Sequence, residues 1–263
     1  MTGGDPLLIS PKKLDQMFEE LFAIPHVKII RLGTKIPAFD PMRISDSPEL
    51  LDAVKRHSRG EQQIYVMMHF NHPREVSPEA ERAIAAVGGA GGLMVAQTPL
   101  LGGVNDDPRV LAELFNRLSY LGVTPYYVFQ GRPTEGNEGF KVKLRHGYRL
   151  FEEAKVSMSG LARRLRFAMS HAAGKLEILG VTADQAFLKF HQARNTANLG
   201  KVFVLPMVRD AYWLDDLLNH PDARDALVAQ GIRVAPTGTT WRDWVGDRDS
   251  AWSSGRTLPS AAR

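Results

Sequence analysis

The feature that most constrains the fold of this chain is a regular alternation between apolar, β-branched runs and amphipathic helical patterns. Strands are predicted over residues 27–32, 64–69, 93–97, 123–130 and 165–170. Helices are predicted near residues 11–23, 48–58, 78–88, 108–121 and 145–158. One strand and one helix recur about every 30 to 40 residues, which is typical of a parallel sheet with crossover helices. The chain is therefore predicted to be α/β, a βα barrel or an open sheet, with functional groups at the C-terminal ends of the strands.

Four of the predicted helices share one start signal, a short polar residue followed by proline. These pairs are Ser10-Pro11, Ser47-Pro48, Ser77-Pro78 and Asp107-Pro108. The polar side chain can accept hydrogen bonds from unpaired N–H groups of the first turn, and proline is favoured there because it has no N–H to satisfy. We therefore expect helices to begin at these four prolines.

The alternation changes after about residue 175. Short strands without intervening helices are predicted over residues 176–181, 186–191 and 202–206. We expect a partial βα barrel over residues 1–175 and a small β-rich, antiparallel appendage over residues 176–245. Residues 246–263 are polar and rich in Ser, Arg and Asp, so a disordered tail is predicted there.

The composition excludes several classes of function. The net charge of +4 is scattered along the chain rather than gathered into a nucleic-acid-binding surface. No apolar run is long enough to span a bilayer and no signal peptide is recognisable, so we expect no membrane partner and a cytoplasmic location. The chain contains no cysteine, which excludes disulfides, thiolate zinc sites and any iron–sulfur cluster ligated by cysteines of this chain.

Polar residues follow the predicted strands, at the edge where ligands bind in parallel folds. His69 and His72 have a spacing that could ligate a metal, but no third ligand is near, so we favour hydrogen bonding and predict no metal site. Gln97 ends the third strand and could bind the polar edge of a ligand. Arg132 and Glu135 follow the fourth strand, where a substrate-binding role and a surface role both stay open.

The turn at Gly3, Gly4 and Asp5 and the lysine at position 175 are two further candidates. Glycine lets the backbone approach a ligand closely, so the turn could present N–H groups and a carboxylate, although a plain loop explains it as well. Lys175 follows the small residues after the fifth strand and could form a Schiff base with pyridoxal phosphate if burial lowers its pKa. A merely solvated lysine is the alternative.

Several segments occur together in one order along the chain. They are residues 2–6 (TGGDP), 24–34 (IPHVKIIRLGT), 42–44 (MRI), 69–73 (HFNHP), 102–108 (GGVNDDP) and 130–136 (QGRPTEG). In this combination the chain resembles the lysine 2,3-aminomutase family of radical S-adenosylmethionine enzymes, over about residues 1–220.

The resemblance implies a partial barrel of the radical S-adenosylmethionine type and an isomerase reaction. Family members use a reduced [4Fe-4S] cluster to cleave S-adenosylmethionine into a radical, while pyridoxal phosphate carries the migrating amino group of an amino-acid substrate. The family's cofactor-binding positions match Gly3, Gly4, Asp5, Arg31, Thr34, His69, Gln97 and Lys175. Arg132 and Glu135 are the candidate substrate-binding residues, and no catalytic residue is assigned.

The chain also departs from the family pattern. The family's cluster cysteines belong to a CxxxCxxC loop before the glycine turn, and this chain has neither that loop nor any cysteine. The family's Gln-Cys-Asp segment reads Gln130-Gly131-Arg132, and a cation at position 132 would repel the side-chain ammonium group of lysine. The glycine run before the cofactor lysine is reduced to Ala172-Ala173-Gly174, which leaves pyridoxal phosphate binding open.

Our main interpretation is an N-terminally truncated fragment of an aminomutase-like enzyme that does not generate the radical by itself. In-frame DNA upstream of Met1 is expected to encode CxxxCxxC if the start codon is misplaced. One alternative is a non-catalytic half-barrel that binds a nucleotide-like or pyridoxal ligand or a partner chain. Another is a pyridoxal phosphate protein without radical chemistry. We also expect poor solubility or homo-oligomerisation, because an open parallel sheet exposes an edge.

Overall fold

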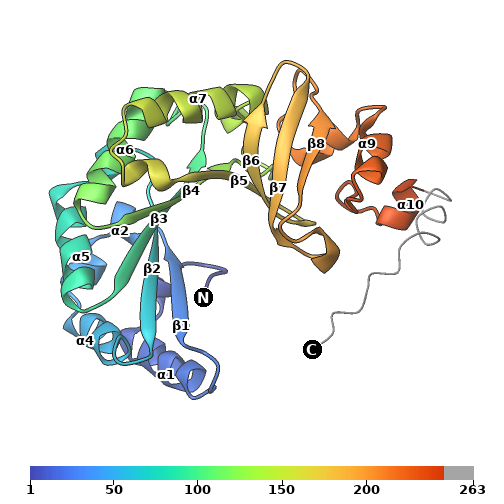
Figure 1. Ribbon diagram of the computed structural model, residues 1–263. Coiled ribbons are helices and arrows are strands. Elements are labelled where there is room, and N and C mark those ends of the chain that lie inside the picture. Colours follow the sequence, from blue (N-terminus) through green and yellow to red (C-terminus); the bar gives the residue numbers. More distant parts are fainter. Residues whose placement is uncertain (246–263) are drawn as a thin grey trace. The chain divides into compact units, whose positions relative to one another are not determined.

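The computed structural model describes residues 1–245 (Figure 1). The tail predicted to be disordered, residues 246–263, lies outside the described residues. The chain divides into two compact units. The first contains Met1–Val142 and His146–Ala168, and the second contains Lys143–Arg145 and Met169–Arg263. The domain boundaries expected at residues 175 and 245 stay a prediction.

The first unit is built on parallel strands that pair in chain order. These strands are β1 (Ile29–Thr34), β2 (Gln63–His69), β3 (Leu93–Leu100), β4 (Thr124–Gln130) and the start of β5 (Arg166–His171). The longer helices are α1 (Pro11–Phe22), α4 (Pro48–Arg56), α5 (Pro78–Gly89), α6 (Pro108–Tyr120) and α7 (Leu144–Val156). Short helical segments are η1 (Pro6–Leu8), α2 (Ile36–Phe39), α3 (Met42–Ser45), η2 (Pro73–Glu75), η3 (Glu138–Phe140) and η4 (Ala162–Arg164). The predicted α/β class is confirmed.

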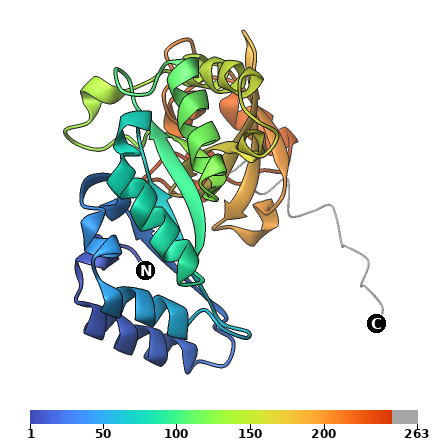
Figure 2. The ribbon, with the colours of Figure 1, turned by 90° about the vertical axis from the view of Figure 1, so that its left-hand side faces the viewer.

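The helices cover one face of the parallel strands (Figures 1 and 2). Ile64, Val66 and Met68 of β2 alternate with partly exposed residues and are at most 2% exposed, so they form the core under the helices. The residues between them, such as Met67 and His69, point to the opposite face. This second face carries Arg31, His69 and Gln97, three of the polar residues that the sequence singled out.

All four polar-residue and proline pairs mark helix starts, as predicted. Ser77 accepts a hydrogen bond from the N–H of Ala80 at 3.2 Å, and Asp107 accepts one from Arg109 at 2.8 Å. Ser10 and Ser47 make no side-chain capping hydrogen bond, so at those two sites the proline alone indicates where the helix begins.

The second unit contains three antiparallel strands and short helices. The strands are β6 (Gly174–Val181), β7 (Gln185–Ala193) and β8 (Val202–Pro206), and they follow the end of β5. The helices are η5 (Thr196–Asn198), α8 (Leu214–Leu218), α9 (Ala223–Ala229) and α10 (Trp241–Val245). Phe190 and Phe203 stack at 5.3 Å between ring centroids in the core, and α9 lies against β8. The antiparallel appendage is confirmed, while its helices were not predicted.

A helix start without proline explains why α8 was missed. The carboxylate of Asp216 accepts hydrogen bonds from the N–H groups of Tyr212 and Trp213, at 2.8 and 2.9 Å. The acceptor therefore comes from inside the helix, and the residue before the helix is an apolar tryptophan. Within the described part of the chain, no helix is long and apolar enough to cross a membrane.

Candidate functional site

The glycine turn at the start of the chain is held against the end of β1 by Asp5. The Asp5 carboxylate accepts hydrogen bonds from the Thr34 hydroxyl at 2.7 Å, from the Lys35 N–H at 2.7 Å and from the Leu7 N–H at 3.0 Å. The Gly33 N–H also donates to the Met1 carbonyl at 3.1 Å. The carboxylate therefore positions the turn, and both of its oxygens are already engaged within the chain.

The two glycines of this turn are needed for their backbone angles. Gly3 has φ +101° and Gly4 has φ +108°, values that L side chains rarely adopt. A Cβ at either position would meet nothing within 4 Å, so crowding does not explain them. Within residues 1–245 their N–H groups donate to no backbone carbonyl. The turn therefore leaves two adjacent donors open to a ligand.

Thr34 has a structural role in this arrangement. Its side chain lies on the helix-covered face, where the residue is 3% exposed. The hydroxyl donates to Asp5 and accepts a hydrogen bond from the Ile36 N–H at 3.0 Å. Thr34 thus connects the turn to the start of α2, and its hydroxyl is fully used.

His69 and Gln97 are brought together on the opposite face of the sheet. They are direct neighbours in the register between β2 and β3. Arg31 lies on the same face of β1, with Tyr65 of β2 as its register partner. The sequence placed these three residues at strand ends, and the parallel register adds that His69 and Gln97 form one adjacent polar pair.

His69 is held as a neutral imidazole. Its Nε2 lies 2.7 Å from the Asn71 side-chain oxygen, which assigns the ring proton to Nε2 and leaves Nδ1 as an acceptor. Burial lowers the pKa of His69, and the positive charge of Lys35 lowers it further, against weaker raising effects of Asn71 and Glu75. The Glu75 carboxylate pairs with Lys35 at 2.9 Å. The site therefore offers an uncharged hydrogen-bonding ring.

His72 serves a different purpose. Its Nδ1 accepts a hydrogen bond from the Arg74 N–H at 3.1 Å and caps η2. Among the described residues, the group of His and acidic side chains close enough to hold a metal is Asp15, Glu19 and His57. Asp15 is already paired with Arg56 at 2.8 Å and His57 at 2.9 Å, so this group is an ion-pair cluster between α1 and α4.

The loop after β4 separates the residues of one sequence motif. Gln130 is 2% exposed and donates to the Val142 carbonyl at 2.7 Å, so it belongs to the core. Arg132 and Glu135 lie in the exposed loop that follows. Asn137 shapes that loop, because its amide donates to the Arg132 carbonyl at 2.7 Å. For Arg132 and Glu135, a substrate-binding role and a surface role therefore both stay open.

Lys175 lies in the second unit, at the start of β6. Gly174 before it has φ +141°, and a Cβ there would fall 2.1 Å from the Gln192 carbonyl oxygen. The Ala173 N–H donates to Nδ1 of His171 at 3.0 Å. The turn that carries Lys175 is therefore fixed by close approach to β7 and by a buried histidine.

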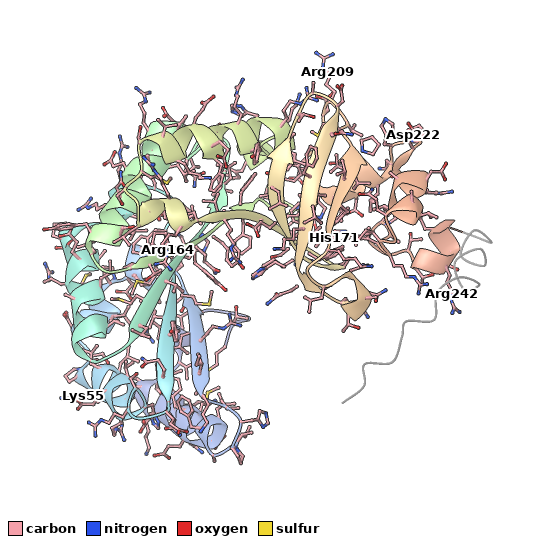
Figure 3. All side chains as sticks on the ribbon, viewed as in Figure 1. Lys55, Arg164, His171, Arg209, Asp222 and Arg242 are labelled. Atoms are coloured by element: carbon pink, nitrogen blue, oxygen red, sulfur yellow. The ribbon has the colours of Figure 1, made fainter. Side chains whose placement is uncertain are left out.

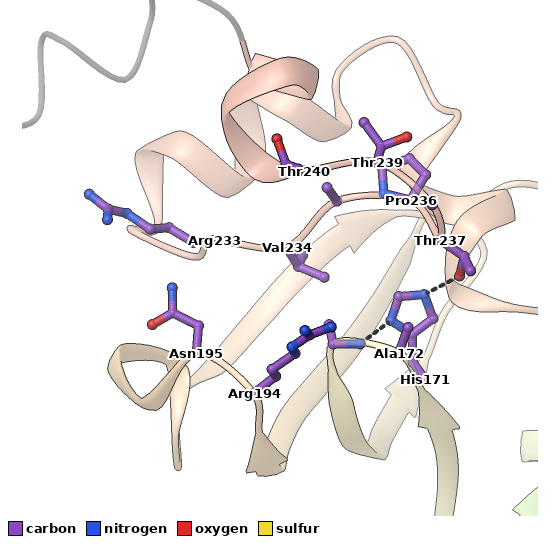
Figure 4. Close-up of a pocket in the computed structure, with 13 residues that line it drawn as sticks. His171, Ala172, Arg194, Asn195, Arg233, Val234, Pro236, Thr237, Thr239 and Thr240 are labelled. Atoms are coloured by element: carbon purple, nitrogen blue, oxygen red, sulfur yellow. Dashed lines mark hydrogen bonds between the residues drawn. The ribbon is translucent and has the colours of Figure 1, made fainter.

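Sequence reasoning missed the network behind this turn. His171 is 7% exposed, and its Nε2 lies 3.1 Å from the Thr237 hydroxyl. Figure 4 shows this contact, and the same hydroxyl donates to the Asp215 carboxylate at 3.0 Å. The three residues are up to 66 positions apart, and no local pattern signals their meeting.

Comparison with known proteins finds relatives of one kind. A protein of Aquifex aeolicus that carries the provisional name L-lysine 2,3-aminomutase is 42% identical over 217 residues, covering 82% of this chain and 58% of that protein. The L-lysine 2,3-aminomutase of Fusobacterium nucleatum is 40% identical over 162 residues, covering 62% of this chain and 37% of that protein. The glutamate 2,3-aminomutase of Clostridioides difficile is 33% identical over 162 residues, with the same coverages.

Two other comparisons add nothing to this result. No protein-family model matches the chain. The chitinase domain of the spore coat protein CotE from Clostridium difficile aligns with a TM-score of 0.31 and 8% identity, over 95% of this chain and 85% of that domain. That likeness is too weak to carry an argument.

Fold and site together define an α/β protein with polar groups at the C-terminal ends of its parallel strands. The chain is a homologue of the lysine 2,3-aminomutase family, which confirms the resemblance drawn from its motifs. It spans 58% of the length of the Aquifex aeolicus relative and 37% of the Fusobacterium nucleatum enzyme. It contains no cysteine, so it has no CxxxCxxC loop.

Proposed function

We propose that this chain carries the cofactor- and substrate-binding part of an aminomutase-like radical S-adenosylmethionine protein that acts on an amino-acid-like substrate. The observation that carries the proposal is the 42% identity over 217 residues to a member of this family. The adjacent polar pair of His69 and Gln97 supports it, because His69 is the last residue of β2 and βα folds bind ligands at the C-terminal ends of their strands.

In this proposal the strand-end face of the first unit receives S-adenosylmethionine. The Gly3 and Gly4 N–H groups are open donors beside the end of β1. The neutral His69 ring and the Gln97 amide supply further hydrogen bonds without adding charge. Arg31 adds one positive charge on the same face. Asp5 and Thr34 act indirectly, by holding the turn in place.

The residues of this chain do not fit the iron–sulfur cluster of the family. Cluster iron is held by cysteine thiolates, and these 263 residues contain none. On its own the chain is expected to bind ligands without cleaving S-adenosylmethionine.

Lys175 fits the attachment of pyridoxal phosphate, whose aldehyde would supply a carbonyl for condensation with amino groups. Lys175 is the second residue of β6, and Gly174 and His171 fix the turn before it. A substrate other than lysine is proposed, because Arg132 disfavours a second ammonium group nearby.

S-adenosylmethionine binding tests the first unit. Titration calorimetry on the purified chain should show saturable binding that Gly4→Ala weakens. Gly60→Ala is the matched control, since Gly60 also has positive φ (+60°) with nothing within 4 Å of its Cβ position, but lies before β2. Equal loss in both variants, or no binding to the parent chain, would refute the proposal.

Pyridoxal phosphate attachment is tested separately. After incubation with the cofactor and borohydride, mass spectrometry should find the reduced adduct on the peptide that contains Lys175. Lys175→Ala should abolish this adduct, and Lys189→Ala, on the neighbouring strand β7, should leave it unchanged. Labelling spread evenly over the lysines would remove Lys175 from the proposal.

One alternative is favoured by a specific observation, the lack of cysteine. In that alternative the chain is a non-catalytic half-barrel that binds a nucleotide-like or pyridoxal ligand, or a partner chain. Anaerobic incubation with iron, sulfide, reductant and S-adenosylmethionine should yield no 5′-deoxyadenosine. Its formation by this chain alone would contradict the ligand argument against a cluster.

A further inference from the structure

The second unit contains a pocket that is separate from the strand-end face of the first unit. It has a volume of about 500 Å³. Three segments of the chain line it, namely residues 171–173, residues 194–195 after β7, and the loop of residues 233–240 (Figure 4). All of these residues belong to the second unit, so the pocket is a feature of that unit alone.

The lining of the pocket is positively charged. Arg194 and Arg233 both contribute to it, and the part of the lining that the structure describes includes no aspartate or glutamate. Asp215 is the nearby acid, but its carboxylate accepts hydrogen bonds from the hydroxyl and N–H of Thr237. The Asp215 carboxylate is thus engaged by Thr237, and Asp215 is not among the residues that line the pocket.

Arg194 is the residue best placed to contact a ligand. Figure 4 shows its side chain directed into the pocket towards the 171–173 turn, whereas Arg233 points outward at the rim. The Arg194 N–H donates to the Ala173 carbonyl at 2.8 Å, which fixes its backbone beside the turn. Among the described residues, no hydrogen bond or ion pair engages the guanidinium group.

Neutral donors also line the pocket. The Asn195 side-chain oxygen accepts from the Ala197 N–H at 3.1 Å, so its NH₂ group is the end left to face a ligand. Thr239 adds a hydroxyl to the lining. Nδ1 of His171 accepts from the Ala173 N–H, so this ring atom is already engaged within the chain. The described lining therefore offers hydrogen-bond donors and positive charge, and it contains no carboxylate.

We propose that this pocket binds a small oxyanion, a phosphate ester or a carboxylate, with Arg194 as its principal contact. The planar guanidinium group matches two oxygens of either anion in a bidentate arrangement. The Asn195 NH₂ group and the Thr239 hydroxyl complete the set of donors. The site is additional to the proposed function and does not depend on S-adenosylmethionine or on Lys175.

Inorganic phosphate and acetate are the probes for this site. Each is titrated into the chain at constant ionic strength, with chloride as the background anion, and binding is followed by two-dimensional NMR. Arg194→Gln should weaken binding by about tenfold or more, the loss expected for one charge-assisted hydrogen bond. Arg209→Gln is the matched control. Arg209 is exposed and follows β8, near the Gln185 end of β7, whereas the pocket lies at the Ala193 end (Figure 3).

The outcomes separate the ligand classes. Saturable binding of phosphate alone assigns a phosphate ester, and binding of acetate as well assigns carboxylates to the site. Either result supports the proposal if the shifted signals belong to residues 171–173, 194–195 and 233–240. The absence of saturable binding for both anions would overturn it. Equal weakening in Arg194→Gln and Arg209→Gln would overturn it too, because it would show a general charge effect.

Discussion

Replacement of Gly174 by alanine is the perturbation that tests the turn before Lys175 most sharply. The added Cβ would lie 2.1 Å from the Gln192 carbonyl oxygen and 2.8 Å from the Ala193 Cα. Both are backbone atoms, so no side-chain rotation relieves the clash. Gly174 also has φ +141°, which L residues rarely adopt. The pairing of β6 with β7 must therefore shift by more than about 1 Å to restore an ordinary contact of 3.4 Å or more.

The expected loss follows from these two contributions. Strained backbone at one residue costs about 1–3 kcal/mol, and displacement of the adjoining ladder loses hydrogen bonds worth about 1 kcal/mol each. We expect Gly174→Ala to lower the free energy of unfolding of the second unit by about 2–4 kcal/mol. Gly180→Ala in the same strand is the control. Its Cβ would sit 3.5 Å from the Phe187 ring, an ordinary contact, and its effect should stay within about 1 kcal/mol.

Urea unfolding followed by tryptophan fluorescence suits this test. Trp213, Trp241 and Trp244 lie in the described part of the second unit, and the first unit contains no tryptophan, so the signal reports the second unit. The same variant should also reduce borohydride-trapped pyridoxal phosphate on Lys175. If Gly174→Ala unfolds at the parent urea concentration, or if Gly180→Ala is equally destabilised, the close approach described here is not what fixes the turn.

Three further predictions concern single polar groups. Thr34→Val should lower the free energy of unfolding by about 1–3 kcal/mol, because the Asp5 carboxylate loses a hydrogen-bond donor. The control is Thr124→Val at an exposed position, which should change it by less than about 0.5 kcal/mol. Both values are measured by urea titration followed by circular dichroism. The pKa of His69 is lowered from its ordinary value of 6.5. The contribution of His69 to the free energy of unfolding should therefore be fully present above pH 6.5 and be lost as the pH falls through the lowered pKa. His69→Gln should flatten that pH dependence, and an unchanged slope would assign it elsewhere. His171→Phe leaves the Ala173 N–H without its acceptor, and fluorescence-monitored unfolding should show a loss of about 1–3 kcal/mol.

Local patterns predicted the secondary structure well where each signal lies within a few residues. The four prolines at helix starts and the apolar strand runs are of this kind. β1 illustrates the limit, since residues 27–32 were expected and the strand is Ile29–Thr34. The bound shifts because Thr34 is kept in the strand by tertiary contacts with Asp5, 29 positions earlier, which no local propensity contains.

The candidate site was predictable as residue types at strand ends but not as geometry. The pairing of His69 with Gln97 depends on the register of two strands, which the sequence does not specify residue by residue. The hydrogen bonds that the Asp5 carboxylate accepts from Leu7, Thr34 and Lys35 could not be read from the sequence, and its role towards a ligand stays a prediction. The pocket around Arg194 was not predicted, because its lining comes from three separate segments of the chain.

Mapping of S-adenosylmethionine on the chain by NMR tests the central claim most directly. Assigned backbone and side-chain signals should be compared before and after addition of the cofactor. We predict saturable shifts at Gly3, Gly4, His69 and Gln97, with signals of α1 and α4 unchanged. Shifts confined to other parts of the chain, or none at all, would contradict the claim that this strand-end face is a cofactor-binding surface.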